Sequence, residues 1–393
     1  MSEKIIESLK TEFIKTFGDG DMRLFFAPGR VNMIGEHTDY NGGHVFPCAL
    51  TLGTYGVIRK REDDKLKFTS LNIQAGKVYE SSLPDLKYEK EDDWTNYAKG
   101  VFWAYLRKGC KIDKGADIMI SGNIPAGSGL SSSASLEVLI GLMIRELYGF
   151  DNIDMVDVAL LGQKAESEFV GMNCGIMDQF ASAMGKEGQA IFLDTSTLEY
   201  DYAPLELKDA HIVITNSNVK HELASSEYNT RRNECREALK DIQAVEPEFK
   251  TLGEMTNEDF ERLKGSIKEE NVMRRARHAV GENIRAIDAV EALKANDIEK
   301  FGRLMNASHV SLRDDYEVSC PELDYLASLA WETEGVIGSR MTGGGFGGCT
   351  VSIIKNDAID GYKKKVSEKY KEKYGLDAEF YVIDPGEGAH EIK

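Results

Sequence analysis

Three ionisable side chains crowd one short turn near the N-terminus of the chain. Residues 30–43 have the sequence RVNMIGEHTDYNGG, which places Glu36, His37 and Asp39 within four positions of one another. A carboxylate can accept hydrogen bonds from two hydroxyl groups, and an imidazole can donate or accept one. The turn therefore suits a ligand that is rich in hydroxyl groups, and a polar surface turn is the equally weighted alternative.

A second segment combines glycine and serine ahead of an apolar helix. Residues 125–135 read PAGSGLSSSAS, and the almost wholly apolar stretch that follows predicts a buried helix. Gly127 and Gly129 permit positive φ and close backbone approach, and the first N–H groups of a helix are unpaired and attract anions. A helix cap needs only one of the serines at 131–133. The segment therefore predicts a phosphate-binding loop.

Two well-known families of phosphate-transfer proteins are excluded. The chain has no G-x-x-x-x-G-K-[ST], so the loop at 125–135 is not a Walker A loop. It also lacks H-R-D and D-F-G, the marks of a protein kinase.

Two further segments could carry chemistry. Residues 341–349, MTGGGFGGC, contain G-x-G-x-x-G, but the strand-like CTVSII follows where a dinucleotide-binding fold requires a helix. We therefore expect a glycine hairpin that backs onto a ligand or another loop, with a purely structural hairpin as the alternative. Residues 165–180, AESEFVGMNCGIMDQF, set Glu166 and Asp178 among small and apolar neighbours. A buried carboxylate there is either functional or held in a salt bridge.

Composition limits the class of protein. A chain of 393 residues predicts about two domains. The formal net charge of −18 argues against a nucleic-acid partner, because phosphates would be repelled. The longest apolar runs are too short to span a membrane, and the six scattered cysteines predict reduced thiols.

The N-terminal segment MSEKIIESLKTEFIKTF has no apolar signal-peptide core, so we expect a cytoplasmic protein. This segment predicts an amphipathic helix with Ile5, Ile6, Leu9 and Phe13 on one side.

Strands and helices alternate without a strict βαβα rhythm, which predicts an α+β protein. A soft boundary near residue 205 divides the chain into domains 1–205 and 206–393. Along the chain we expect a strand from residue 23 that breaks at Pro28-Gly29, β-rich runs around Gly53 and Gly56, a hairpin at 190–205, mostly helices from Glu222 to about Ala307, and a charged helix before a strand at 378–383.

Three glycine-containing segments, residues 30–43, 125–135 and 341–349, resemble those of the galactokinase family of the GHMP small-molecule kinases. The resemblance extends over nearly the whole chain and includes GMNCGIMDQF, SSEYNTRR and RRARHAVGEN. Segment 30–43 is the most specific, and it departs from the family pattern by Met33, where Leu is common. The resemblance implies an N-terminal domain like domain 2 of ribosomal protein S5, a C-terminal ferredoxin-like domain, and an active site in the cleft between them. It also implies that no obligate protein partner is needed.

The implied reaction is the Mg²⁺-dependent transfer of phosphate from ATP to the C1 hydroxyl of α-D-galactose. Its products are α-D-galactose 1-phosphate and ADP, and it is the first committed step of the Leloir pathway. Asp178 would be the catalytic base, and Arg30 would be its partner and would stabilise charge in the transition state. The implied sugar contacts are Glu36, His37, Thr38, Asp39, Gly175, Asp178 and Tyr228, the implied ATP contacts are Ser70, Gly127, Ser128, Gly129, Leu130, Ser131, Ser132 and Ser133, and the implied Mg²⁺ ligands are Ser133 and Glu166.

Two rival hypotheses stay open. A kinase of another sugar, such as N-acetylgalactosamine or arabinose, would share these loops and differ in the side chains of the sugar pocket; the length of the chain and its lack of long insertions favour a bacterial galactokinase. A galactokinase-like sensor would bind ATP and galactose but regulate transcription. Known sensors of this kind have a shortened glycine-serine loop, whereas Ser133-Ala134-Ser135 is intact here. The intact loop favours the enzyme.

Overall fold

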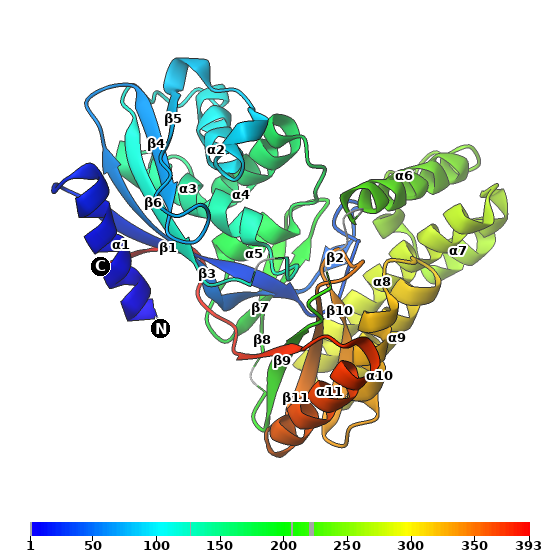
Figure 1. The fold of residues 1–393 in the computed structure, drawn as a ribbon. Helices are drawn as coiled ribbons and strands as arrows, with labels where there is room; N and C mark the ends of the chain where they lie inside the picture. Colours follow the sequence, from blue (N-terminus) through cyan, green and yellow to red (C-terminus); the bar gives the residue numbers. More distant parts are fainter. Residues whose placement is uncertain (1, 126, 206, 220–223) are drawn as a thin grey trace.

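The computed structural model describes residues 2–125, 127–205, 207–219 and 224–393 (Figure 1). Its largest sheet has six strands in the order β13-β1-β3-β6-β4-β5. All neighbours in this sheet are antiparallel except β4 and β6. The strands are β1 (Arg23–Asn32), β3 (Pro47–Lys60), β4 (Lys65–Ser70), β5 (Tyr79–Ser82), β6 (Ala116–Gly122) and β13 (His390–Ile392).

Helices cover both faces of this sheet (Figure 1). α1 (Ser2–Phe17) packs on one face through Leu9 and Phe13, which are buried against β1, β3 and β6, as its amphipathic pattern predicts. The other face carries the remaining helices of this domain: α2 (Thr95–Arg107), α3 (Ser132–Tyr148), α4 (Met155–Lys164) and α5 (Met177–Met184).

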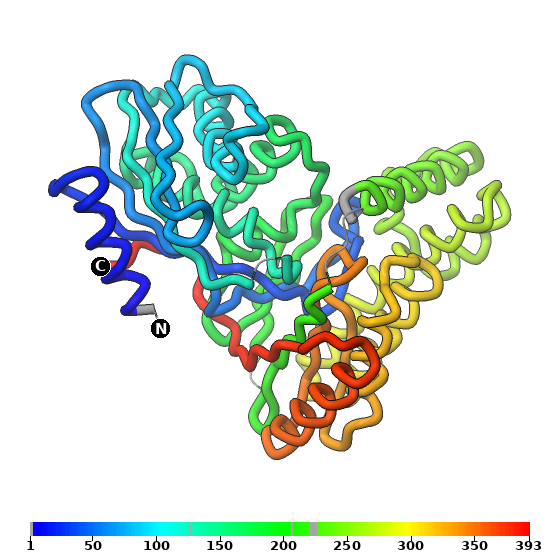
Figure 2. The backbone as a smooth tube through the Cα atoms, in the orientation of Figure 1, coloured from blue at the N-terminus to red at the C-terminus, as the bar shows by residue number. Residues whose placement is uncertain are grey.

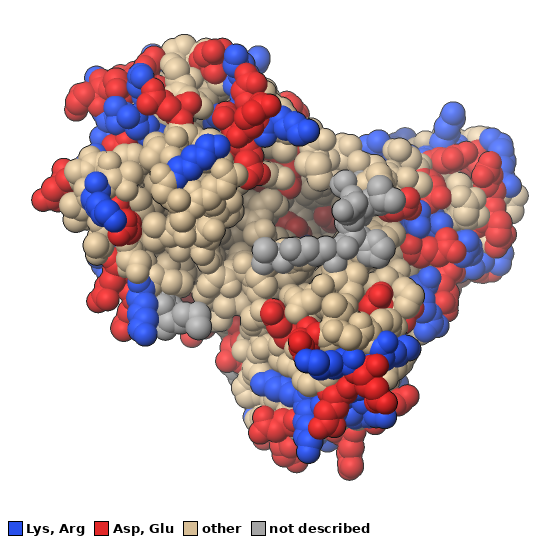
Figure 3. Space-filling view, viewed as in Figure 1, with Lys and Arg blue, Asp and Glu red and all other residues tan. Residues whose placement is uncertain are grey.

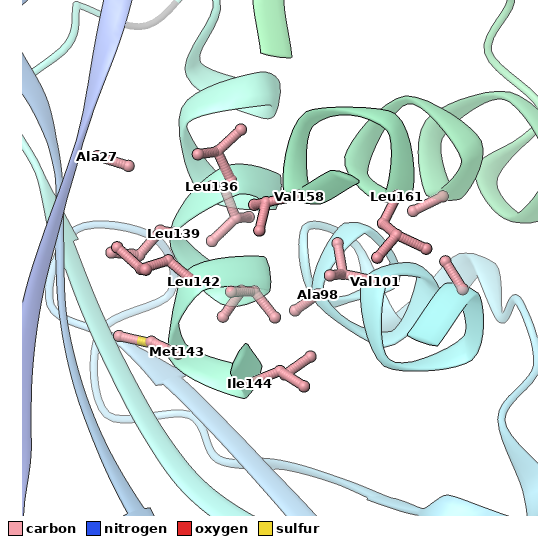
Figure 4. Packing of buried hydrophobic residues seen from close by; sticks show 14 of the residues in the cluster. Ala27, Ala98, Val101, Leu136, Leu139, Leu142, Met143, Ile144, Val158 and Leu161 are labelled. Carbon is pink, nitrogen blue, oxygen red and sulfur yellow. The ribbon is translucent and has the colours of Figure 1, made fainter. Parts of the chain in front are cut away.

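α3 is the central helix of this layer. Its apolar side chains are buried on nearly every side, which confirms the prediction from the sequence. In Figure 4, Leu139 and Met143 point toward the strands where Ala27 lies. Val101 of α2 and Val158 of α4 approach α3 from the opposite side. The start of α3 is thereby fixed relative to the sheet.

The second part of the chain contains a four-stranded antiparallel sheet in the order β10-β11-β9-β12. Its strands are β9 (Ala210–Asn216), β10 (Val336–Thr342), β11 (Cys349–Lys355) and β12 (Glu379–Ile383). The helices of this part are α6 (Ala224–Gln243), α7 (Asn257–Leu263), α8 (Glu270–Lys294), α9 (Ile298–Asp314), α10 (Pro321–Trp331) and α11 (Ile359–Tyr374). The predicted helical region agrees with α6 to α9, although its predicted start at Glu222 lies outside the described residues.

Smaller elements complete the fold. β2 (His44–Val45), β7 (Gln189–Asp194) and β8 (Tyr200–Pro204) form a three-stranded sheet, so the predicted hairpin at 190–205 is confirmed. Single 3₁₀ turns lie at Leu83–Asp85, Lys90–Asp92, Leu252–Glu254, Lys264–Ser266 and Asn356–Ala358, and a π-helical turn, Ala165–Val170, follows α4.

Two features differ from the sequence-based expectation. β1 does not end at Pro28-Gly29 but continues through a bulge between Pro28 and Arg30, because a bulge tolerates the missing proline N–H. The C-terminal tail returns to the first domain, where β13 pairs with β1, so residues beyond the predicted boundary at 205 complete the first sheet. Figure 2 shows this tail running back to the side of the molecule that also carries the N-terminus.

All six cysteines are unpaired, as expected. Among the described residues, no helix has both the length and the apolar character needed to cross a bilayer.

Candidate active site

A cavity of about 380 Å³ lies where segments 30–43, 125–135 and 341–349 meet. Figure 3 shows a hollow between the lobes of the molecule. Its walls come from the turn after β1, the loop before α3, segment 172–178 and the loop between β10 and β11. Most of the predicted site residues line it: Arg30, Glu36, His37, Asp39, Gly127, Ser128, Gly129, Leu130, Ser131, Ser132, Ser133, Glu166, Gly175, Asp178 and Tyr228.

Thr38 and Ser70 are the two predicted site residues that the structure does not bring to the cavity wall. The buried hydroxyl of Thr38 lies 2.8 Å from the carbonyl oxygen of Gly35 and 2.6 Å from that of His44. Ser70 Oγ accepts hydrogen bonds of 3.1 Å from the N–H groups of Asn72 and Ile73. Both side chains therefore hold nearby backbone in place.

Arg30 and Asp178 form a bidentate ion pair at the centre of the cavity. Arg30 Nε donates to Asp178 Oδ1 and Arg30 Nη2 to Asp178 Oδ2, each at 2.8 Å. Arg30 Nη1 donates to the carbonyl oxygen of Gly129 at 2.7 Å, and Ser131 Oγ donates to Asp178 Oδ2. This fork fixes both oxygens of the carboxylate. The side chain of Asp178 remains 31% exposed, so a ligand in the cavity can reach it.

The bulge in β1 explains how Arg30 reaches this position. A Cβ at Gly29 would lie 2.5 Å from the carbonyl oxygen of Leu130, so only glycine allows β1 and the second loop to approach this closely. The backbone N–H of Arg30 donates to the same carbonyl at 3.2 Å. Bulges often re-aim a side chain beside an active site, and here the bulge turns Arg30 into the cavity.

Glu36 ties the first loop to the third. Its Oε2 accepts from Asn32 Nδ2 at 2.7 Å, and its Oε1 accepts from the N–H of Gly343 at 2.6 Å and from Thr342 Oγ1 at 3.0 Å. The guanidinium of Arg340 lies 3.3 Å from Oε1. Both carboxylate oxygens are thus engaged within the protein, which holds the two domains together at the cavity.

His37 is neutral and oriented by a tyrosine. Burial, followed by the nearby His278, lowers the pKa of His37 to about 3. Its Nδ1 lies 2.7 Å from the hydroxyl of Tyr40, and its Nε2 is buried without a hydrogen-bond partner. The ring of Tyr228 lies 5.5 Å from that of His37, and burial keeps the pKa of Tyr228 well above its ordinary value. The two side chains therefore offer an uncharged donor or acceptor each.

Asp39 lies against Gly175 with no room for a side chain between them. A Cβ at position 175 would lie 1.7 Å from Asp39 Oδ2. Burial, and then the carboxylates of Asp178 and Glu36, raise the pKa of Asp39 to about 7. This carboxyl group is therefore close to half protonated near neutral pH, and it can accept or donate hydrogen bonds to hydroxyl groups.

The second loop has the backbone geometry of an anion site. Gly127, Gly129 and Ser131 adopt positive φ, and α3 begins at Ser132 without a side-chain cap. The first N–H groups of α3 are therefore available to a ligand. The third loop packs directly behind it, because Cβ atoms at Gly343 and Gly348 would lie 3.1 Å from the carbonyl oxygens of Gly129 and Ser128. The glycine hairpin thus backs onto another loop, as expected.

Glu166 and Ser133 lie together beside this loop. Glu166 is in the π-helical turn, a feature that is frequent at functional sites. Its carboxylate accepts a hydrogen bond from Gln179 Nε2 at 2.7 Å, and burial, followed by Asp178, raises its pKa.

These two side chains fit a magnesium ion that arrives with a nucleotide. Within the described residues, no cluster of three or more His, Cys, Asp or Glu side chains could hold a metal ion alone. Mg²⁺ is commonly bound by one or two carboxylates, with water and substrate phosphates completing its shell. The hydroxyl of Ser133 and the carboxylate of Glu166 are hard oxygen donors beside the uncapped start of α3, where an anion would fit.

The structure also reveals residues that sequence reasoning missed. Asn173 and Asn229 line the cavity and are hydrogen-bonded to each other at 3.3 Å across two domains. Gln179 donates to two buried carboxylates, those of Glu137 and Glu166. The sequence held one signal for Glu137, which is an acidic residue in the otherwise apolar core face of α3.

Comparisons with known proteins agree with this geometry. Residues 11–60 match the galactokinase galactose-binding signature, residues 96–186 the N-terminal domain of GHMP kinases, and residues 289–372 the C-terminal domain of GHMP kinases. The galactokinases of Ligilactobacillus salivarius and Bacillus subtilis are 53% and 51% identical to this chain, with 99% and 98% of this chain and 99% of each relative aligned.

Solved structures give the same result. The crystal structure of Lactococcus lactis galactokinase complexed with galactose superposes with a TM-score of 0.96 and 45% identity, covering 99% of this chain and 100% of that one. Mevalonate kinase of Methanococcus jannaschii, at 20% identity, shares the fold with a TM-score of 0.64 over 94% of this chain and 99% of that one. The predicted two-domain α+β fold of the GHMP kinases is thus confirmed. The chain belongs to the galactokinase family.

Proposed function

We propose that this protein transfers the γ-phosphate of ATP to the C1 hydroxyl of α-D-galactose, giving α-D-galactose 1-phosphate and ADP. One observation carries the proposal. The carboxylate of Asp178, fixed by Arg30, lies in one cavity with the polar turn at 30–43 and with the glycine-serine loop before α3. A base placed between these two loops would meet the sugar hydroxyl on one side and the phosphate on the other.

Asp178 would accept the proton of the C1 hydroxyl as that oxygen attacks phosphorus. Arg30 neutralises the carboxylate before transfer, and its guanidinium lies close enough to the second loop to offset charge on the transferred phosphoryl group. The free N–H groups at the start of α3 would hold the phosphates. Phosphoryl transfer depends mainly on positioning and electrostatic stabilisation, which these groups supply.

Ser133 and Glu166 would hold Mg²⁺, which supplies charge neutralisation between the phosphate oxygens when it is bound. The sugar would be held by Asp39, His37 and Tyr228. We further propose that the protein acts in the cytoplasm without an obligate protein partner. Its two domains would be residues 1–205 and 206–393, with β13 of the second segment added to the first sheet.

An ADP-release assay with a panel of sugars tests the proposal. We expect rapid, galactose-dependent ADP formation and a product whose ³¹P resonance couples to the proton on C1. Faster turnover of N-acetylgalactosamine or arabinose would favour the kinase of another sugar. Tight binding of galactose and ATP without ADP formation would favour a sensor.

A further inference from the structure

Glu137 is a buried carboxyl group that the proposed mechanism does not use. It lies in α3 among apolar residues, and its side chain is inaccessible to solvent. The side chain of Glu137 packs against Gly162 of α4. A Cβ at position 162 would lie 3.3 Å from Glu137 Cβ and 3.3 Å from Gln179 Cγ, so glycine leaves room for both side chains. A carboxyl group in such surroundings costs free energy unless it is hydrogen-bonded.

Gln179 connects Glu137 to the candidate metal site. Its Nε2 donates to Glu137 Oε2 at 2.8 Å and to Glu166 Oε2 at 2.7 Å. The two amide hydrogens of one buried glutamine thus serve two carboxyl groups from different parts of the chain. Glu166 is thereby held from behind, on the side away from the cavity.

Two atoms of this cluster have no hydrogen-bond donor. Glu137 Oε1 and Gln179 Oε1 are both buried and unpartnered, and both are acceptors. A proton on Glu137 would give the pair its missing donor, whereas an ionised Glu137 would leave a buried charge with a single hydrogen bond. Burial, and then the charge of Glu166, raise the pKa of Glu137 well above its ordinary value, which agrees with a neutral acid.

We propose that Glu137 is a positioning residue for the metal ligand Glu166: as a neutral acid it fixes the amide of Gln179 so that the NH₂ group, and not the carbonyl, faces Glu166. A flipped amide would point its oxygen at the carboxylate and repel it. Glu166 then keeps one oxygen on Gln179 and presents the other toward Ser133. This inference rests on the proposed Mg²⁺ site, and it assigns that site a support outside the cavity.

The test measures Mn²⁺ binding with ADP by calorimetry, as well as the Mg²⁺ dependence of turnover. Glu137→Met removes the polar group at similar volume and should weaken Mn²⁺ binding by about 10- to 100-fold, the usual effect of losing an outer-shell partner. Galactose binding without nucleotide should be unchanged. Glu137→Gln, a neutral isostere that can both donate and accept, should bind Mn²⁺ like the wild type.

A double variant shows whether Glu137 acts through Gln179. Glu137→Met combined with Gln179→Met should bind Mn²⁺ no more weakly than Gln179→Met alone. Tyr105→Phe is the matched control, because it removes another buried hydrogen bond of α3, from Tyr105 to the carbonyl of Gly141, and should leave Mn²⁺ binding unchanged. If Glu137→Met does not fold, Glu137→Asp takes its place, since its shorter side chain cannot reach Gln179.

Three results would overturn the inference. They are wild-type Mn²⁺ binding in Glu137→Met, a loss in Glu137→Gln equal to that in Glu137→Met, or losses that multiply in the double variant. Glu166→Ala separates this failure from a failure of the metal site itself. If Glu166→Ala binds Mn²⁺ like the wild type, the assignment of the metal ligand is wrong, and the role of Glu137 falls with it.

Discussion

The contact between Gly175 and Asp39 makes Gly175→Ala a sensitive probe of the proposed sugar site. The new Cβ would lie 1.7 Å from Asp39 Oδ2 and 2.1 Å from Asp39 Cγ. Since real Cβ atoms are not approached within 3.0 Å, the carboxyl group must move by about 1.3 Å. Gly175 has no positive φ, so alanine itself strains no backbone there. The substitution therefore displaces one functional group and little else.

A displacement of this size is large for a site that orients a substrate. A misplacement of 1 Å can cost about 10²-fold in rate, so we expect kcat/KM for galactose to fall by about 10²-fold or more. The KM for ATP should stay near the wild-type value, because the phosphate loop is not touched. Both quantities are measured by coupled ADP release at varied galactose and varied ATP.

A second background tests the cause of this loss. In Asp39→Ala the clashing carboxyl group is absent, so adding Gly175→Ala should reduce kcat/KM no further. Gly361→Ala serves as a control, because a Cβ on this exposed residue of α11 meets nothing within 4 Å. Wild-type kinetics in Gly175→Ala would refute the reasoning, as would an equal further loss in the Asp39→Ala background.

Four further results are expected from three carboxyl groups. Asp178→Asn should lower kcat by at least ~10²-fold while galactose still binds in calorimetry; near-normal turnover would remove it as the base. Glu166→Ala should lose activity that added Mg²⁺ partly restores, and Asp178→Asn should show no such rescue; equal responses of the two variants would contradict their separate roles. Asp39→Ala should cut kcat/KM for galactose steeply and leave the low rate with glucose almost unchanged, since a site built to pair a hydroxyl can discriminate by roughly 10⁴-fold; equal proportional losses would mean that Asp39 only shapes the loop. Without galactose, the folded protein holds a proton on Asp39 up to about pH 7, whereas the unfolded chain releases it near pH 4, so this group lowers stability as pH rises through that window. The melting temperature of Asp39→Asn should therefore rise relative to that of the wild type between pH 5 and pH 8. A difference in melting temperature that stays constant over this range would contradict the shifted pKa.

The residues that line the cavity were easier to predict than those that hold them in place. The ends of helices and the glycine turns carry local signals, so the loop before α3 and the turn at 30–43 could be recognised from a few residues. Long-range pairing carries no such signal. Nothing in the sequence near His390 shows that β13 joins β1, and nothing near Gly29 shows that a bulge, rather than a break, turns Arg30 into the cavity.

The same limit explains the side chains whose placement differed from expectation. Thr38 lies within the turn at 30–43, yet its hydroxyl faces the backbone because the turn must pair its own carbonyl groups when it is buried. Ser70 was expected beside the nucleotide, yet its hydroxyl oxygen accepts hydrogen bonds from the backbone N–H groups of Asn72 and Ile73. In both cases the direction of the side chain depends on backbone groups whose positions only the folded structure shows.

Charge in the cavity gives a reason why the nucleotide should enter with a divalent cation. Among the described residues, four carboxyl groups line the cavity against one guanidinium, that of Arg30. Asp178 is paired with Arg30, Glu36 is saturated by protein donors, and Asp39 is half protonated near pH 7.

Glu166 is a lining carboxyl group that has no ion pair among the described residues, and the groups that act most strongly on it are Asp178, Cys174, Ser133 and Gln179. It lies beside the loop that would bind the triphosphate, so a bare nucleotide would add like charge to an uncompensated one, at short range and away from bulk water. A divalent cation placed between Glu166 and the nucleotide attracts both of them and so replaces their mutual repulsion. We therefore expect this arrangement of charges to favour the metal complex of the nucleotide over the free nucleotide, because the described residues that line the cavity place no positive side chain against Glu166.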